Sequence, residues 1–173
     1  MVYCGIALMV AVAAVSAGLA LRGVRLERQI SAANLRALRH AQSDTFAGYI
    51  EARDQYMAVV RVSGSPAARA ALARMLAAIA VEFAEGLGAA EAAVAELGNY
   101  RSADAAVARA LVALAKQDSM EGGLVDAVVH DYPGEPYGPY LAGRVALAQG
   151  RAKEAEAGFR AALSPSTRFS TAG

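Results

Sequence analysis

Tryptophan is absent from this chain of 173 residues, cysteine occurs only at Cys4, and histidine only at His40 and His130. A single cysteine excludes an intrachain disulfide and a cysteine-based metal site. Neither histidine has a second ligand at a spacing typical of a metal site, so we expect His40 to be exposed and His130 to cap a helix. The sequence therefore predicts no catalytic residue, no metal ligand and no cofactor, and we do not expect an enzyme.

Aromatic residues make up only 6% of the chain, whereas 44 of its residues are alanine by count. Alanine is the best intrinsic helix former, and the β-branched and aromatic residues that favour strands are sparse outside the first segment. The sequence predicts an all-α fold.

The opening stretch lacks charge: no Asp, Glu, Lys or Arg occurs in residues 1–21. About 20 apolar residues suffice for a helix that crosses ~30 Å of hydrocarbon, so this range is predicted as a single transmembrane helix. A cleaved secretory signal is the main alternative, although its usual basic start is missing; a buried helix of a soluble protein is the other. Small residues follow one face of the helix and are candidates for packing against another membrane helix, unless they reflect only the alanine content: Ala7, Ala11, Ala14 and Gly18.

Charge is unevenly distributed after this segment. Between Arg22 and Arg74 there are nine arginines and four acidic residues, whereas from Met75 onward acidic residues outnumber basic ones by twelve to eight. Residues 22–62 are predicted to form a long basic stalk helix. Its arginines are expected to contact anionic lipid headgroups or an acidic protein surface: Arg22, Arg25, Arg28, Arg36 and Arg39. Because basic residues follow the membrane helix, they favour a cytoplasmic location for the rest of the chain.

Glycine and proline then divide the chain into short helices. Residues 66–131 are predicted to form antiparallel helical pairs, with helices at 66–86, 89–97, 103–116 and 124–130. A rigid loop is expected at 131–139 because it contains three prolines and two glycines, followed by helices at 140–149 and 152–163. The glutamates between Glu82 and Glu96 are interpreted as exposed helical residues.

The stretch "YPGEPYGPYLAGRVALAQGRAKEAEAGFRAALSP" resembles a tetratricopeptide repeat, which we place at 136–169. The resemblance implies that small and aromatic residues pack the two helices together: Gly143, Gly150, Ala155, Phe159 and Ala162. In such repeats the first helix lines the concave face. Candidate partner-binding residues are therefore Tyr137, Tyr140, Arg144 and Leu147, unless the tyrosines only fix the turn between repeats.

The order of parts is similar to that of the bacterial YfgM-like group of membrane-anchored tetratricopeptide proteins. This resemblance implies an inner-membrane adaptor, near the export machinery, whose repeat domain faces the periplasm. The charge pattern favours the opposite side, so the side of the membrane stays open.

Together these features predict a non-catalytic adaptor or accessory subunit, anchored by one helix in the bacterial inner membrane. Its partner would be an integral membrane protein complex, bioenergetic or translocating, rather than a small-molecule substrate. An export chaperone accessory of the YfgM type is the alternative. Nucleic-acid binding through residues 22–74 is a further hypothesis, which we do not favour over lipid contact.

Overall fold

The structure is a computed structural model that describes residue 32 and residues 45–118 and 121–163. Within these residues all regular secondary structure is helical, which confirms the all-α prediction. The helices are α2 (Phe46–Ser63), α3 (Pro66–Phe83), α4 (Leu87–Glu96), α5 (Ala103–Lys116), α6 (Glu121–Asp131), α7 (Tyr137–Ala148) and α8 (Ala152–Leu163).

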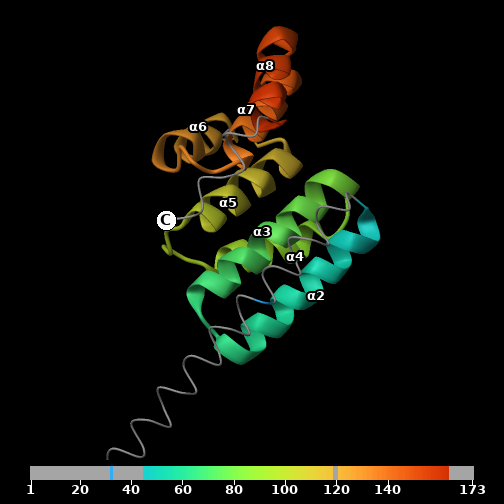
Figure 1. The fold of residues 1–173 in the computed structure, drawn as a ribbon, viewed down its shortest axis with the longest axis vertical. Coiled ribbons are helices and arrows are strands. Elements are labelled where there is room, and N and C mark those ends of the chain that lie inside the picture. Colours follow the sequence, from blue (N-terminus) through green and yellow to red (C-terminus); the bar gives the residue numbers. More distant parts are fainter. Residues whose placement is uncertain (1–31, 33–44, 119–120, 164–173) are drawn as a thin grey trace, which may run out of the picture.

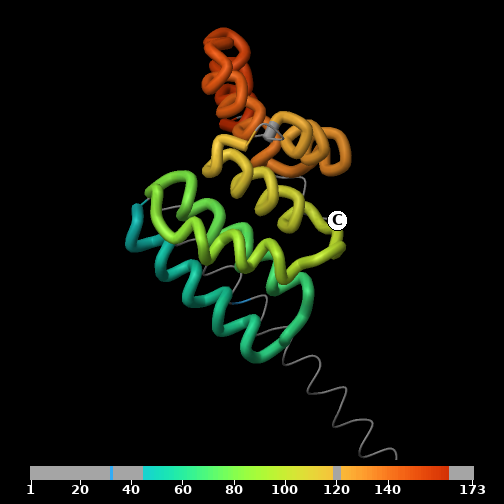
Figure 2. Tube along the Cα trace, turned by 180° about the vertical axis from the view of Figure 1, so that it is seen from behind, coloured from blue at the N-terminus to red at the C-terminus, as the bar shows by residue number. Residues whose placement is uncertain are grey.

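Each helix packs on the next one in the chain, and α3 packs in addition on α5. In Figure 1, α2, α3 and α4 form the lower part of the molecule, α5 crosses the middle, and α7 and α8 stand at the top. The reverse view in Figure 2 shows the same order. The pair α7–α8 touches the remaining helices only through α7, so α8 is the outermost layer.

Alanine allows the central helices to lie close together. The buried face of α5 includes Val107, Ala110 and Leu111, each 0% exposed, and faces an alanine-rich side of α3 that includes Ala77 at 0%. Toward the start of α3, a smaller cluster joins Ala70 and Leu97. Each small side chain buries little apolar area, so the stability of this core depends on the many close contacts between helices.

Hydroxyl caps fix the starts of three helices. The side chains of Thr45, Ser65 and Ser102 accept hydrogen bonds from the backbone N–H groups of Gly48, Ala68 and Ala105, each at 3.2 Å. Such a cap satisfies an N–H group that has no partner within the helix. The predicted start at Pro66 is therefore confirmed, and α8 has the predicted bounds of 152–163.

Several predicted helix boundaries differ from the structure: α3 ends at Phe83 rather than at residue 86, and α6 runs over Glu121–Asp131 rather than over 124–130. Of the predicted stalk 22–62, α2 is the part that the structure describes as a whole helix; it begins at Phe46 after its cap at Thr45 and buries Tyr49, Tyr56 and other residues against α3. The loop expected at 131–139 ends early, because α7 begins at Tyr137. Pro139 fits into the first turn of α7, where a backbone N–H would have no helical partner in any case.

Candidate functional site

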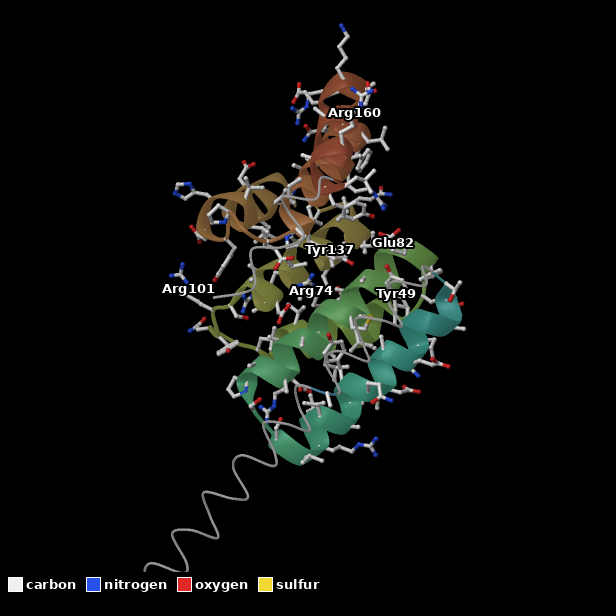
Figure 3. The ribbon with its side chains drawn as sticks, viewed as in Figure 1. Tyr49, Arg74, Glu82, Arg101, Tyr137 and Arg160 are labelled. Carbon is white, nitrogen blue, oxygen red and sulfur yellow. The ribbon has the colours of Figure 1, made fainter. Side chains whose placement is uncertain are left out.

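Arg74 on α3 joins three separate elements at the centre of the domain. Its guanidinium donates to Asp104 in the first turn of α5 at 2.7 Å and lies 3.1 Å from Glu135, in the loop before α7. The same group lies over the ring of Tyr137, with its carbon 4.5 Å from the ring centroid. Figure 3 shows Arg74 and Tyr137 next to each other between α3 and α7.

The cluster contains one cation and two carboxylates, and Arg74 is paired with both of them. Burial lowers the pKa of Arg74, but the carboxylates of Glu135 and Asp104 outweigh it and the net shift is upward. Burial raises the pKa of Tyr137, and also that of Tyr56, which is raised further by the charge of Asp104. Within the described part of the chain no buried side-chain nitrogen or oxygen lacks a hydrogen-bond partner. The cluster therefore serves packing, and its polar groups are already occupied.

A second cluster, closer to the end of α3, joins α3 to the α7–α8 pair. The hydroxyl of Tyr140 donates to the Glu82 carboxylate, and Arg144 donates to the Tyr140 oxygen at 2.6 Å and to Glu82 at 3.4 Å. The ring of Tyr140 also packs against that of Phe159 on α8, with centroids 6.0 Å apart. Burial, followed by the hydrogen bond to Glu82, raises the pKa of Tyr140 well above its usual value of 10.0.

A groove opens beside this second cluster, where α3, α5 and α7 all end. We call it the three-helix groove; it has a volume of about 680 Å³. Its lining residues are Ala80, Val81, Ala84, Leu114, Ala115, Gln117, Arg144, Leu147 and Ala148. Most of them are apolar, and Leu147 is 55% exposed. Val62 at 64% and Leu163 at 67% are exposed as well, but neither lines the groove.

The four predicted partner-binding residues lie in the Arg74 cluster, in the second cluster and in the groove. Tyr137, Tyr140 and Arg144 lie together but contact α3 of the same chain. Leu147 faces the groove and contributes its exposed side chain to it. Of the four, Leu147 is exposed, whereas the other three are half-buried.

The predicted repeat-packing residues lie at the interface of α7 and α8 or in its turn. A Cβ atom on Gly143 would lie 2.8 Å from the Phe159 ring, and Ala155 is 2% exposed. Gly150 forms the turn with φ +73°, and Ala162 is half-buried. The sequence analysis missed Gly158, where a Cβ atom would lie 2.9 Å from the Gly143 backbone. A glycine inside a predicted helix was the signal that could have identified it, because glycine weakens a helix unless packing requires it.

Other predicted residues lie outside the described part of the chain. They are the membrane-packing residues Ala7, Ala11, Ala14 and Gly18 and the stalk arginines Arg22, Arg25, Arg28, Arg36 and Arg39. No helix that the structure describes combines the length and the apolar character of a membrane span.

In residues 45–118 and 121–163, no three His, Cys, Asp or Glu side chains are grouped closely enough to hold a metal ion. His130 is exposed and lies in the last turn of α6, where an imidazole can interact with the helix carbonyls. Glu82 and Glu91, from the predicted acidic run, form ion pairs with Arg144 and Lys116.

The sequence analysis did not anticipate Arg74, Glu82 or Glu135 as organising residues. The partners of Arg74 and Glu82 in these clusters lie 30 to 63 positions away in the chain, so no local pattern marks them. Over the described residues the geometry defines an all-α fold with a groove at one end of three helices. Comparison of the chain with models of protein families, with curated proteins and with solved structures finds no match.

Proposed function

We propose that this protein is a non-catalytic, membrane-anchored adaptor that binds a partner protein in the three-helix groove. The observation that carries the proposal is the exposed Leu147, set among the alanines and leucines with which α3, α5 and α7 end. Exposed apolar side chains gathered in a concavity are typical of protein-recognition sites.

The resemblance to tetratricopeptide repeats supports this choice of surface. If α3–α4, α5–α6 and α7–α8 are three successive pairs, then α3, α5 and α7 are their first helices. In repeats of this kind the first helices line the concave face. Every residue that lines the groove either lies in one of these three helices or directly follows the last residue of one of them.

The outer side of α8 supports an array that ends with this pair. Charged residues cover it, and all are exposed: Arg151, Lys153, Glu154, Glu156 and Arg160. Figure 3 shows Arg160 pointing away from the other helices. Helical arrays need a polar outer face on their terminal unit to prevent further stacking, so the groove is the more suitable surface for a partner.

Anchoring is the part of the proposal that rests on sequence alone. Residues 1–21 would form the membrane helix, and the arginines after it would contact lipid headgroups or an acidic subunit. In this arrangement the groove is held near the membrane surface, where it would bind a subunit of a bioenergetic or translocation complex.

Site-specific crosslinking in cells tests the proposal. A photoreactive amino acid replaces Leu147 in one variant and Val129 in a control, because Val129 is a comparably exposed apolar residue on α6, outside the groove lining. We expect a discrete crosslinked product of higher mass from position 147 and none from position 129. The absence of a product at 147, or identical products at both positions, would overturn the proposal.

A further inference from the structure

The three-helix groove has an unusual electrostatic setting, because it lies at the C-terminal ends of three helices. Val81 belongs to the last turn of α3, Leu114 to that of α5 and Leu147 to that of α7. Each helix end carries about half a negative charge from its aligned peptide dipoles. Three such ends around one groove favour a positively charged occupant.

The end of α3 is the least compensated of the three. The ends of α5 and α7 are closed by backbone hydrogen bonds, from Gln117 and Gln149 respectively. For α3 no capping N–H bond occurs among the described residues, and its last turn contains no basic residue. The final carbonyls of a helix without such a cap are available to an external donor, and Lys or Arg side chains are suitable donors.

One acidic side chain, that of Glu85, adds to this negative potential, whereas Glu82 is neutralised by Arg144. Glu82 lies in the last turn of α3, and Glu85 directly follows the groove residue Ala84. The partial negative charge of a helix C-terminus repels an acidic side chain placed there, so a nearby cation stabilises that side chain. Arg144 on the groove wall is bonded to Glu82, and Lys116 at the end of α5 is bonded to Glu91. Glu85 is exposed and forms no ion pair with any described residue.

From these observations we infer that the groove binds a segment of a partner protein in which lysine or arginine stands next to apolar residues. This inference rests on the proposed function and names the chemistry of the partner. The apolar side chains would pack on Val81, Leu114 and Leu147, and the cationic group would lie at the end of α3 beside Glu85. The negative potential would then select against acidic segments of the same apolar character.

The experiment measures the binding of fluorescently labelled peptides to the purified full chain in non-ionic detergent, with empty micelles as the blank. The first peptide is an amphipathic sequence of leucine and lysine of about 14 residues, or ~21 Å as a helix. The second and third carry glutamine or glutamate in place of every lysine. We expect saturable binding of the lysine peptide, at least about fivefold weaker binding of the glutamine peptide, and none of the glutamate peptide. Binding should also weaken with added salt, which screens exposed charges.

Two matched variants test whether the preference for the lysine peptide comes from the charge of Glu85. Glu85→Lys should weaken binding of the lysine peptide about fivefold or more, whereas Glu96→Lys should change it less than about twofold. Glu96 is also exposed but lies at the opposite end of the ten-residue helix α4, ~15 Å from its start. Both positions are exposed, so circular dichroism should show unchanged helix content in each variant.

The outcomes separate this inference from the proposed function. If the lysine and glutamine peptides bind equally well, and Leu147→Asp abolishes the binding of both, the groove is a protein-binding site and the charge inference is wrong. If no peptide binds, or if Leu147→Asp leaves binding unchanged, the groove is not the binding site and both proposals fail.

Discussion

Arg74 and Tyr137 hold the α7–α8 pair in place against α3, with the guanidinium carbon 4.5 Å from the tyrosine ring centroid. No direct backbone packing joins α3 and α7, which contact each other through side chains. The position of α7 decides where Leu147 lies. The shape of the three-helix groove therefore depends on this contact and on that between Tyr140 and Glu82.

Replacing Arg74 should destabilise the fold. Arg74→Met removes the cation between Asp104 and Glu135 and leaves both carboxylates without compensation. Because the arginine side chain is 24% exposed, we expect a loss of about 2 kcal/mol, less than the ~3–5 kcal/mol typical of fully buried pairs. Urea unfolding measures the change.

Arg101→Met is the control for this prediction. The Arg101 side chain is 81% exposed and lies 3.5 Å from Asp131, so its loss should cost less than about 0.5 kcal/mol. Equal losses for the two variants would contradict a special role for Arg74.

The hydrogen bond between Tyr140 and Glu82 should be measurable as a coupling. Tyr140→Phe and Glu82→Gln each weaken the contact between α7 and α3, and the double variant should be less destabilised than the sum of the two. We expect a coupling of about 1 kcal/mol, since one partner is charged but both are partly exposed. Additive effects in thermal unfolding would show that the contact contributes nothing to stability.

Stability should decrease in alkaline solution. The pKa values of Tyr56, Tyr137 and Tyr140 are raised in the folded chain from 10.0, chiefly by burial. Above that pH the unfolded chain releases these protons first, so the folded state binds more protons and the free energy of unfolding falls as pH rises. Below about pH 9 the three tyrosines should not contribute to any change of the free energy of unfolding with pH. Tyr140→Phe should reduce the slope above pH 10, and an unchanged slope would contradict the assignment to Tyr140.

Adding a methyl group at Gly158 should loosen the α7–α8 pair. Its Cβ atom would lie 2.9 Å from the Gly143 backbone, which can move only with the helix. We expect Gly158→Ala to cost about 2 kcal/mol or more, as overpacking does elsewhere. Gly123→Ala on α6 is the control: no atom lies within 4 Å, so alanine should stabilise the helix by about 0.5 kcal/mol. The opposite order in thermal unfolding would show that the two helices do not approach closely.

The parts of the fold that depend on near neighbours could be predicted from sequence. The helix starts after Ser65 and Ser102 depend on hydrogen bonds between residues three apart. The start of α7 was predicted too late because proline and glycine suggested a loop. Instead, the Glu135 carboxylate accepts from the Tyr137 N–H at 3.2 Å and supports a helix start.

The site could be predicted only in part. Leu147 was identified from the resemblance and does lie in the groove. The same resemblance also predicted that Tyr137 binds a partner, but its ring is covered by Arg74, a residue 63 positions earlier in the chain. That pairing depends on how α3 and α7 come together, and no spacing within either helix contains this information. The sequence likewise does not indicate that three helix ends meet at one groove, because the residues that meet there are far apart in the chain.

The adaptor proposal is tested most directly by the size of the species that contains the full chain after extraction from membranes in mild detergent. We predict that the wild-type chain migrates in native electrophoresis well above its own mass of 17.8 kDa with bound detergent. Leu147→Asp should release it to the size of the single chain, and Val129→Asp should not. Migration of the wild-type chain as a single chain at every detergent concentration would contradict the proposal.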